Sequence, residues 1–362
     1  MIPLRILHAV ADPAGPEGLA ARASAEALRE AGHTATLIAP GLDQPSCLGF
    51  RPGWWAWATG ERTRTVRAVA QWMPDVLHVH GVQVLGPLLE VARRLGLGVV
   101  ASLTQGEDPH AARRLRDPRI GWVVVPTEHL RAHALGRIGL ARDRLALIPP
   151  LLPPMEPHQA AGSSWRLGIL GLPEPGLLAA LNEILEAVAE VQESGLALEA
   201  VVHTGWLGPR VRASVDPLLA QFQATAIDAD LPAFLAQVDA VALASRREMP
   251  AIAVLAAQAA GLPVVAKPIG GIPELISDGW HGLLVSGHGV EAWASSLRQL
   301  HDHQRRGSMG TAAQTECQDR FRNADAIDAL VALYRSALGT GGAAAKAEVS
   351  QTWRRLSDAR AR

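Results

Sequence analysis

The feature that most constrains the fold of this chain is a repeated alternation of short apolar runs with longer amphipathic runs. The first apolar run, LRILHAV at 4–10, is followed by the helical pattern LAARASAEALREAGH at 19–33 and then by TATLIAP at 34–40. Near-continuous apolar runs are typical of buried parallel strands, and the amphipathic runs between them predict crossover helices. The sequence therefore predicts an α/β protein whose parallel sheets carry helices on both faces.

A proline-rich segment separates two blocks of this alternation. About six βα units fill residues 1–150 and predict a first Rossmann-like, doubly wound domain. The following segment reads LLPPMEPHQAAGSS, and because prolines remove backbone donors we expect 151–164 to be an interdomain linker. The alternation resumes at WRLGILG and predicts a second Rossmann-like domain over 165–319. A chain of 362 residues is long enough for two domains of about 150 residues each.

Two segments follow the second block. The apolar spacing of 320–338 predicts a helix. Residues 339–362 are rich in glycine and alanine and then basic and polar, which predicts a flexible tail. A partner-binding role for this tail is the alternative.

Composition excludes several classes of function. A formal net charge of −1 and a pI near 6.9 give no general attraction to nucleic acid or to an anionic membrane. Cys47 and Cys317 lie far apart, which implies neither a disulfide framework nor a zinc cluster. We find no export signal and no long apolar run, so we expect a cytoplasmic protein. Trp54, Trp55 and Trp57 stand among arginines and leave open a peripheral membrane contact, with local packing as the alternative.

Residues 248–285 form the most informative motif in the chain. They read EMPAIAVLAAQAAGLPVVAKPIGGIPELISDGWHGLLV. Glu248 opens a helical run that ends in small residues and Gly261, and LPVVA then follows as a buried parallel strand. The segment therefore reads as one βα unit with an acidic residue at its start.

A glycine loop follows that strand. Gly270 and Gly271 can bring bare backbone amides close to a ligand. Pro273 and Glu274 can start the next helix, where amides and dipole both favour an anion. The loop predicts a binding site for an anionic ligand.

This motif resembles the donor-sugar half of family 4-type retaining glycosyltransferases, which have the GT-B fold and use nucleotide-sugar donors. GLPVVA, GGIPELI and DGWHGLLV stand in the order and spacing that the family uses. The resemblance implies two Rossmann-like domains facing across a cleft, an acceptor-side domain at 1–150 and a donor domain at 165–319, with the helix at 320–338 returning to the first domain. It also implies a UDP- or GDP-sugar as donor substrate, with no metal and no other cofactor.

The resemblance assigns roles at the donor side. Glu248 matches the first of two family glutamates and would face the sugar hydroxyls at the catalytic centre, whereas Ala256 occupies the place of the second, ribose-facing glutamate. The family's diphosphate-binding arginine and lysine are replaced by Leu172 and Pro175 in ILGLPEPG. The residues that would hold the donor are therefore Glu248, Lys267, Gly270, Gly271, Glu274, Arg246 and Arg247. For each of these cations the alternative is a solvated surface charge.

The resemblance also assigns an acceptor side. PDVLHVHG at 74–81 is similar to a family strand whose end faces the cleft, which makes His80 a catalytic or acceptor-side candidate; a hydrogen-bonded structural histidine is the alternative. Gly15 and Gly18 in the first loop could present amides, with a simple turn as the alternative, and Gln105 follows the strand VVASLT. The acceptor itself is left open among a glycan, a lipid-linked molecule and a small molecule.

The sequence thus predicts transfer of a sugar from a nucleotide sugar, with retention of configuration. The alternative is a catalytically silent GT-B protein that binds a protein partner or a glycan, because three donor contacts are replaced. A third interpretation is a GT-B enzyme that catalyses another reaction, such as sugar epimerisation. The sequence disfavours it, because we find no dedicated pair of acid and base residues. His301 and His303 flank Asp302 on a predicted polar helix, which favours a solvated face over a metal site. Trp206 and Trp280 could stack on a sugar, although core packing is the alternative for both.

Overall fold

The computed structural model describes residues 2–40, 47–50, 69–106, 112–155 and 165–338. The chain divides into two compact units. Unit 1 comprises Met1–Leu152 together with Arg322–Arg362, and unit 2 comprises Pro153–Phe321. The tryptophans at 54, 55 and 57 and the predicted tail at 339–362 lie outside the described residues.

Unit 1 is built on a seven-stranded parallel sheet with the order β3-β2-β1-β4-β5-β6-β7. This order runs outward from β1 in one direction and then, from β4, in the other, which is the doubly wound arrangement. The strands are β1 Arg5–Val10, β2 Thr34–Pro40, β3 Cys47–Phe50, β4 Val76–His80, β5 Gly98–Ser102, β6 Ile120–Val125 and β7 Leu145–Leu147.

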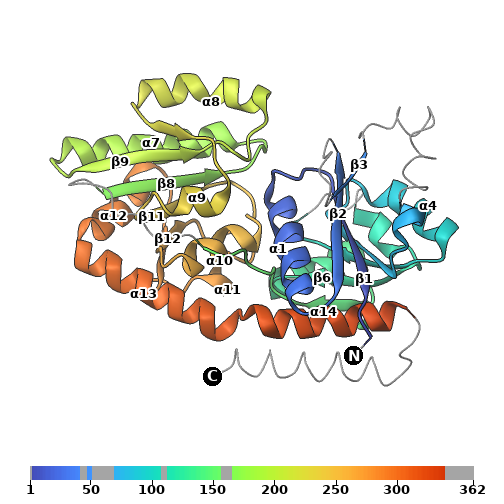
Figure 1. Cartoon of the computed structure of the whole chain (residues 1–362). Coiled ribbons are helices and arrows are strands. Elements are labelled where there is room, and N and C mark those ends of the chain that lie inside the picture. Colours follow the sequence, from blue (N-terminus) through green and yellow to red (C-terminus); the bar gives the residue numbers. More distant parts are fainter. Residues whose placement is uncertain (1, 41–46, 51–68, 107–111, 156–164, 339–362) are drawn as a thin grey trace. The chain divides into compact units, whose positions relative to one another are not determined.

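Helices cover both faces of this sheet (Figure 1). Successive residues of a strand point to opposite faces. Leu7 and Leu77 therefore pack in the core with the helix at 85–95, whereas Ile6 and Val76 pack in the core with the helices at 16–30 and 323–337. The helical segments of unit 1 whose two ends both lie in the described residues are α1 Pro16–Glu30, α4 Leu85–Leu95, η1 Arg113–Arg116, α6 Glu128–His133, η2 Ala134–Ile138, η3 Arg142–Arg144 and α14 Asn323–Ala337.

The last helix belongs to unit 1, although its start differs from the predicted one. The sequence pattern placed a helix at 320–338, whereas Arg320 ends the preceding helix and α14 begins at Asn323. The Asn323 side chain ties the first turn of α14 to the end of the first stretch of unit 1, because its Oδ1 accepts from the Leu152 amide at 3.0 Å and its Nδ2 donates to the Leu152 carbonyl at 2.9 Å. Leu151 is buried in the same core. The first two residues of the predicted linker are thus part of unit 1.

Unit 2 is built on a six-stranded parallel sheet with the order β10-β9-β8-β11-β12-β13. Here the order reverses between β8 and β11, so unit 2 is doubly wound as well. Its strands are β8 Trp165–Gly171, β9 Leu198–His203, β10 Thr225–Ile227, β11 Ala240–Ala244, β12 Val264–Ala266 and β13 Gly282–Leu284. Its helices are α7 Leu177–Glu193, α8 Pro209–Gln221, α9 Leu231–Leu235, α10 Ala251–Ala259, α11 Ile272–Leu275, α12 Val290–His301 and α13 His303–Arg320.

One helix of the prediction is two helices in the structure. Asp302 was expected inside a polar helix with His301 and His303 on either side. Instead α12 ends at His301, and the Asp302 side chain caps α13 by accepting from the Arg305 amide at 3.0 Å. A short polar side chain at the N-cap satisfies an amide that the helix leaves unpaired, so it separates two helices here. Among the helices that the structure describes, none combines the length and apolar character needed to span a bilayer.

Candidate functional site

The reversal of strand order in unit 2 marks the place where a ligand can bind. In an open doubly wound sheet, ligands bind outside the carboxyl ends of the two strands between which the order reverses. These strands are β8 and β11, and the loops that follow them span 172–176 and 245–250. The loop after β12, at 267–271, adjoins them in the same sheet. We call these three loops the switch-point site of unit 2.

Glu248 and the glycine loop meet in this site. Glu248 Oε1 accepts a hydrogen bond from the Gly271 amide at 2.8 Å. Gly270 has φ +62°, and a Cβ there would lie 2.7 Å from the Cβ, Cγ and Cδ atoms of Glu248. A side chain at 270 would therefore be strained by the backbone and would overlap Glu248. The structure thus brings Glu248, Gly270 and Gly271 together.

The same contact changes the roles expected for the loop amides. The motif assigns the amides of both Gly270 and Gly271 to the ligand. The Gly271 amide is bonded to Glu248 instead, which leaves the Gly270 amide for that role. The helix that follows, α11, holds four residues, including Glu274. Because the macrodipole is a sum over aligned peptides, one turn contributes little anion binding. The expected dipole contribution from this helix is therefore small.

Lys267 is engaged within unit 2. Its Nζ donates to both carboxylate oxygens of Glu183 on α7, at 2.8 and 2.9 Å, and the two side chains are 19% and 12% exposed. Glu183 also accepts from the Gly289 amide at 3.0 Å and lies 3.9 Å from the Arg246 guanidinium. The charge of Lys267 is thus compensated by a neighbouring carboxylate. Arg246 and Arg247 have exposed side chains.

Glu174, which the sequence reasoning did not single out, connects the two loops of the switch point. Its Oε1 accepts from the Ser245 hydroxyl and from the Arg246 amide, the latter at 3.3 Å. The backbone of Gly176, with φ +104°, packs against the Arg246 side chain, and a Cβ there would lie 3.3 Å from Arg246 Cδ. The loop after β8 is therefore held against the loop after β11 by a carboxylate.

The three replaced positions offer no charge to a ligand. Ala256 is fully buried, as are its neighbours on α10 from Ala251 to Gln258. Leu172 is buried and Pro175 is exposed. The places where the resemblance expects a ribose carboxylate and two phosphate-binding cations are filled by apolar side chains.

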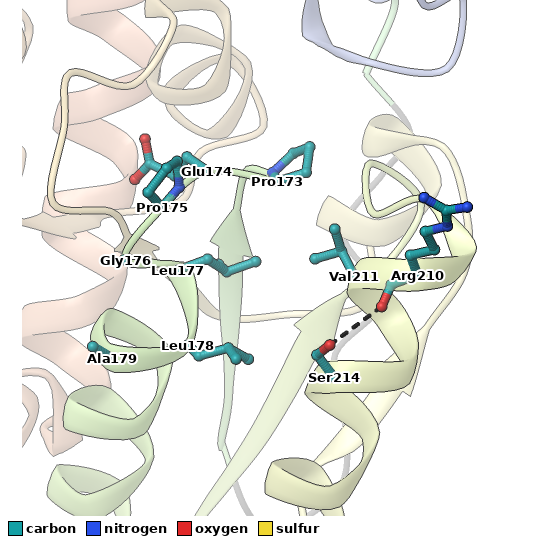
Figure 2. Close-up of a pocket in the computed structure, with 10 residues that line it drawn as sticks. All are labelled: Pro173, Glu174, Pro175, Gly176, Leu177, Leu178, Ala179, Arg210, Val211 and Ser214. Carbon is teal, nitrogen blue, oxygen red and sulfur yellow. Dashed lines mark hydrogen bonds between the residues drawn. The ribbon is translucent and has the colours of Figure 1, made fainter.

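A pocket opens beside the switch-point site, between the first turns of α7 and α8 (Figure 2). Its volume is about 630 Å³. Figure 2 shows Leu177 and Val211 pointing toward one another across it, whereas the Glu174 carboxylate points away from α8. The residues that line it are Pro173, Glu174, Pro175, Gly176, Leu177, Leu178, Ala179, Arg210, Val211 and Ser214.

The two tryptophans proposed for sugar stacking have different surroundings. Trp206 is 4% exposed and meets the His203 ring edge-on at 5.1 Å, which is the core packing given as its alternative. Trp280 is 67% exposed in the turn before β13. Of the two, only Trp280 therefore presents a ring to solvent.

In unit 1 the strand order reverses between β1 and β4, and the predicted acceptor-side glycines lie after β1. Gly15 is buried at the N-cap of α1 with φ −73°, an ordinary extended conformation. A Cβ on Gly18 would lie 2.2 Å from the Pro13 carbonyl oxygen, so this glycine allows close backbone packing. Nearby, Thr104 Oγ1 donates to Glu17 Oε1 at 2.9 Å, and Gln105 is half-buried. The Glu17–Thr104 bond connects α1 to the loop after β5.

His80 lies in a buried cluster with His8 and His78. His8 Nδ1 and His80 Nε2 are 2.9 Å apart, and His78 bonds the Tyr334 hydroxyl through Nδ1 and the Ser102 hydroxyl through Nε2, each at 2.8 Å. His8 is 0% exposed, His78 is 2% exposed and His80 is 3% exposed. This burial and these contacts fit the hydrogen-bonded structural role that is the alternative for His80, and its catalytic or acceptor-side role stays a prediction.

Burial sets the charge of this cluster. It lowers the pKa of His80 to about 3, and together with the neighbouring imidazoles it lowers the pKa of His8 and His78 well below the usual value. The three residues offer nitrogen atoms within 4.8 Å of one another, which is a candidate metal-ligand set. Both His78 nitrogens are occupied by hydrogen bonds and His8 Nδ1 bonds His80, whereas His8 Nε2 is buried with no hydrogen-bond partner among the described residues.

Some of these groups could have been found from the sequence. Glu174 stands directly after the first strand of the second block, and the order-reversal rule points to that loop. Glu183 and Tyr334 carry no such signal, because each meets its partner only through the packing of a distant helix.

The comparisons with known proteins agree with this arrangement. The family model described as Glycosyltransferase Family 4 matches residues 20–154, and the model described as Glycosyl transferases group 1 matches residues 167–303. D-inositol 3-phosphate glycosyltransferase of Mycobacterium marinum is 38% identical over 112 residues, which are 30% of this chain and 24% of that protein. The same enzyme of Corynebacterium aurimucosum is 41% identical over 110 residues, 30% of this chain and 26% of that protein. The matched region thus spans about a quarter of these relatives.

Solved structures share the fold over nearly the whole chain. Anabaena HepE in complex with UDP and glucose has a TM-score of 0.73 at 16% identity and covers 92% of this chain and 100% of its own. Sucrose-phosphate synthase from Thermosynechococcus elongatus has a TM-score of 0.72 at 14% identity, covering 93% of this chain and 100% of its own. At these identities the likeness establishes the fold. With one family model on each doubly wound unit, the chain belongs to the family 4 and group 1 glycosyl transferases of the GT-B fold.

Proposed function

We propose that this chain is a nucleotide-sugar-dependent glycosyltransferase that transfers a sugar to an acceptor hydroxyl with retention of configuration. The observation that carries the proposal is the Glu248–Gly271 hydrogen bond at the switch-point site of unit 2, with Gly270 packed directly on the glutamate. A protein that uses this fold only as a scaffold would not need a glycine forced to φ +62° against an acidic side chain.

The donor is placed in unit 2. Glu248 orients the sugar hydroxyls, as a carboxylate accepts hydrogen bonds from them. The Gly270 amide and the exposed Arg246 and Arg247 are the groups assigned to the diphosphate. Lys267 acts indirectly in this proposal, because its pair with Glu183 fixes the start of the glycine loop. Uridine is the first base to test, since HepE was solved with UDP and glucose.

The reaction requires few reactive side chains. In front-face transfer, the acceptor hydroxyl attacks the anomeric carbon on the side from which the diphosphate leaves, and the leaving oxygen takes the acceptor proton. The rate then depends on positioning and on stabilisation of the departing charge. The groups that we assign to this step are the Glu248 carboxylate, for the sugar hydroxyls, and the exposed Arg246 and Arg247, for the departing charge.

The acceptor is assigned to unit 1. The groups placed there are the loop with Gly15 and Gly18, the Glu17–Thr104 pair and Gln105. His80 ends β4 beside β1 and is buried, so in this proposal it acts through its bond to His8 and does not touch the acceptor. The relatives named D-inositol 3-phosphate glycosyltransferase make an inositol phosphate the first acceptor to test.

The test is a calorimetric panel of UDP, GDP, ADP and their sugars against the full chain, with Glu248→Ala and Glu193→Ala as a matched pair. Glu193 is an exposed carboxylate at the far end of α7 and controls for net charge. We expect one nucleotide sugar to bind the wild type and the Glu193 variant, and binding to Glu248→Ala to be weaker by about tenfold or more. Equal binding to all three proteins would refute the donor-site assignment.

A catalytically silent GT-B protein is the second candidate. It is favoured by the compensated charge of Lys267 and by the apolar residues at 172, 175 and 256. Two missing charge-assisted contacts cost roughly 3 to 6 kcal/mol of diphosphate binding. The same panel separates the two, since a silent protein binds none of the nucleotide sugars at millimolar concentration or binds without turnover in the presence of acceptor.

A further inference from the structure

The Glu174 carboxylate occupies a position that an incoming anion would use. It accepts from the Ser245 hydroxyl and the Arg246 amide, two donors on the loop after β11. Ser245 Oγ also accepts from the Arg247 amide at 3.0 Å and lies 2.9 Å from the Arg247 carbonyl, a second acceptor for its single proton, so the hydroxyl is held in place by its own loop. A fixed hydroxyl and a backbone amide at the reversal of a doubly wound sheet are the kind of donors that bind phosphate oxygens. In this structure they bind a carboxylate of the chain itself.

The charges around Glu174 point the same way. Glu183 on α7 pairs with Lys267 and lies 3.9 Å from the Arg246 guanidinium. The carboxylate of Glu183 therefore neutralises part of the positive charge that a diphosphate would need in this region. Glu174 adds a further negative charge beside Arg246. A diphosphate entering the site would meet this carboxylate at close range, and like charges a few ångströms apart near a protein surface repel each other.

We propose that Glu174 is an internal competitor for the donor's diphosphate and thereby sets the donor affinity of the site. The inference rests on the proposed function, because it concerns the same donor. Donor binding requires the Glu174 side chain to leave the Ser245 hydroxyl and the Arg246 amide, which then bond the phosphate oxygens. Glu174 acts on affinity and specificity and takes no part in bond making.

The loop is built so that this exchange needs only a side-chain movement. Pro173 and Pro175 fix the backbone on either side of Glu174. The Glu174 amide donates to the Leu172 carbonyl at 2.8 Å, and its carbonyl accepts from the Leu177 amide at 3.2 Å. The side chain is only half-buried and borders the pocket between α7 and α8, which gives a displaced carboxylate access to solvent.

The experiment compares wild type with Glu174→Gln, Glu174→Ala and the control Glu193→Gln, with UDP and inorganic pyrophosphate as probes in calorimetry. Glu174→Gln keeps an oxygen acceptor for Ser245 and removes the charge, whereas Glu174→Ala removes both. We expect both Glu174 variants to bind UDP and pyrophosphate about tenfold tighter, and the control to match wild type. Thermal melts of each variant show whether it is folded. A purely structural role predicts the opposite sign, with weaker binding and a lower Tm.

The outcomes separate this inference from the proposed function. If wild type binds UDP and the Glu174 variants bind it equally or more weakly, the inference is wrong and the donor site stands. If wild type fails to bind and Glu174→Ala binds, the competitor role is confirmed. If folded wild type and variants all fail to bind either probe, both the inference and the donor site are refuted.

Discussion

At the scale of single residues, the site depends on what glycine allows rather than on what a reactive group supplies. Gly270 adopts φ +62° and lies against the whole Glu248 side chain. Glu248 and the two glycines could be chosen from the sequence, because a glycine loop after a buried strand has a recognisable pattern. The partners of Lys267 and the role of Glu174 could not, because both depend on which helix and which loop the sheet order places beside them.

Replacing Gly270 with alanine tests this dependence. We expect Gly270→Ala to destabilise the chain by about 1 to 2 kcal/mol through the left-handed backbone, and by about 1 to 3 kcal/mol more through overlap with Glu248. Gly279→Ala is the matched control, because Gly279 has φ +75° and a Cβ added there would meet no atom of the described residues within 4 Å, so it carries only the backbone cost. Urea unfolding of the two variants measures the difference. Equal losses would show that the contact with Glu248 is not tight.

At the scale of elements, the alternation of the sequence predicted most of the strands, because buried parallel strands are apolar throughout, but it missed β3. WRLGILG, for example, is β8 from end to end. Helix boundaries were predicted less well. The break at Asp302 depends on one polar side chain that accepts from a backbone amide of α13, and helical spacing continues across it. Helical spacing also continues across the start of α14 at Asn323, so the sequence pattern did not mark that boundary.

The contact of α14 with the sheet yields a second prediction. Tyr334, the single tyrosine of the chain, bonds His78 Nδ1 at 2.8 Å inside the core. We expect Tyr334→Phe to lower the free energy of unfolding by about 1 to 3 kcal/mol, since it leaves a buried imidazole nitrogen without its partner. Ser336→Ala removes a longer bond, 3.3 Å from Trp122 Nε1, on the same helix and should cost less. Denaturant unfolding followed by tryptophan fluorescence compares the two, and a larger loss for Ser336→Ala would contradict this ranking.

At the scale of the whole molecule, the histidine cluster couples stability to pH. The order of strands could be predicted as doubly wound, but the register that places His8 opposite His78 is a property of the assembled sheet. Burial keeps these imidazoles neutral in the folded state, whereas in the unfolded chain a histidine titrates near pH 6.5. Below that pH the unfolded chain binds protons that the folded chain does not, so stability decreases as the pH falls from about 6.5 toward 3.

The size of this effect can be measured. Each histidine that stays neutral should cost about 1.4 kcal/mol of stability per pH unit below about 6. Urea unfolding should therefore give a much smaller free energy of unfolding at pH 5 than at pH 7.5. His80→Gln should reduce the dependence of this free energy on pH by the contribution of one histidine. His288→Gln, at an exposed position of unit 2, is the control. An unchanged slope for His80→Gln would mean that His80 is protonated in the folded chain.

The position of α14 also has a consequence for synthesis of the chain. Unit 1 comprises two stretches that are separated by the whole of unit 2, and the Tyr334–His78 contact joins residues 256 positions apart. On a ribosome, unit 2 emerges complete and can fold before the last helix of unit 1 has been translated. Until α14 has been translated, one face of the unit 1 sheet stays exposed, because α14 covers that face in the folded chain. A chaperone that shields nascent apolar surface would therefore act on the first-made half of this protein, and for longer than the order of synthesis suggests.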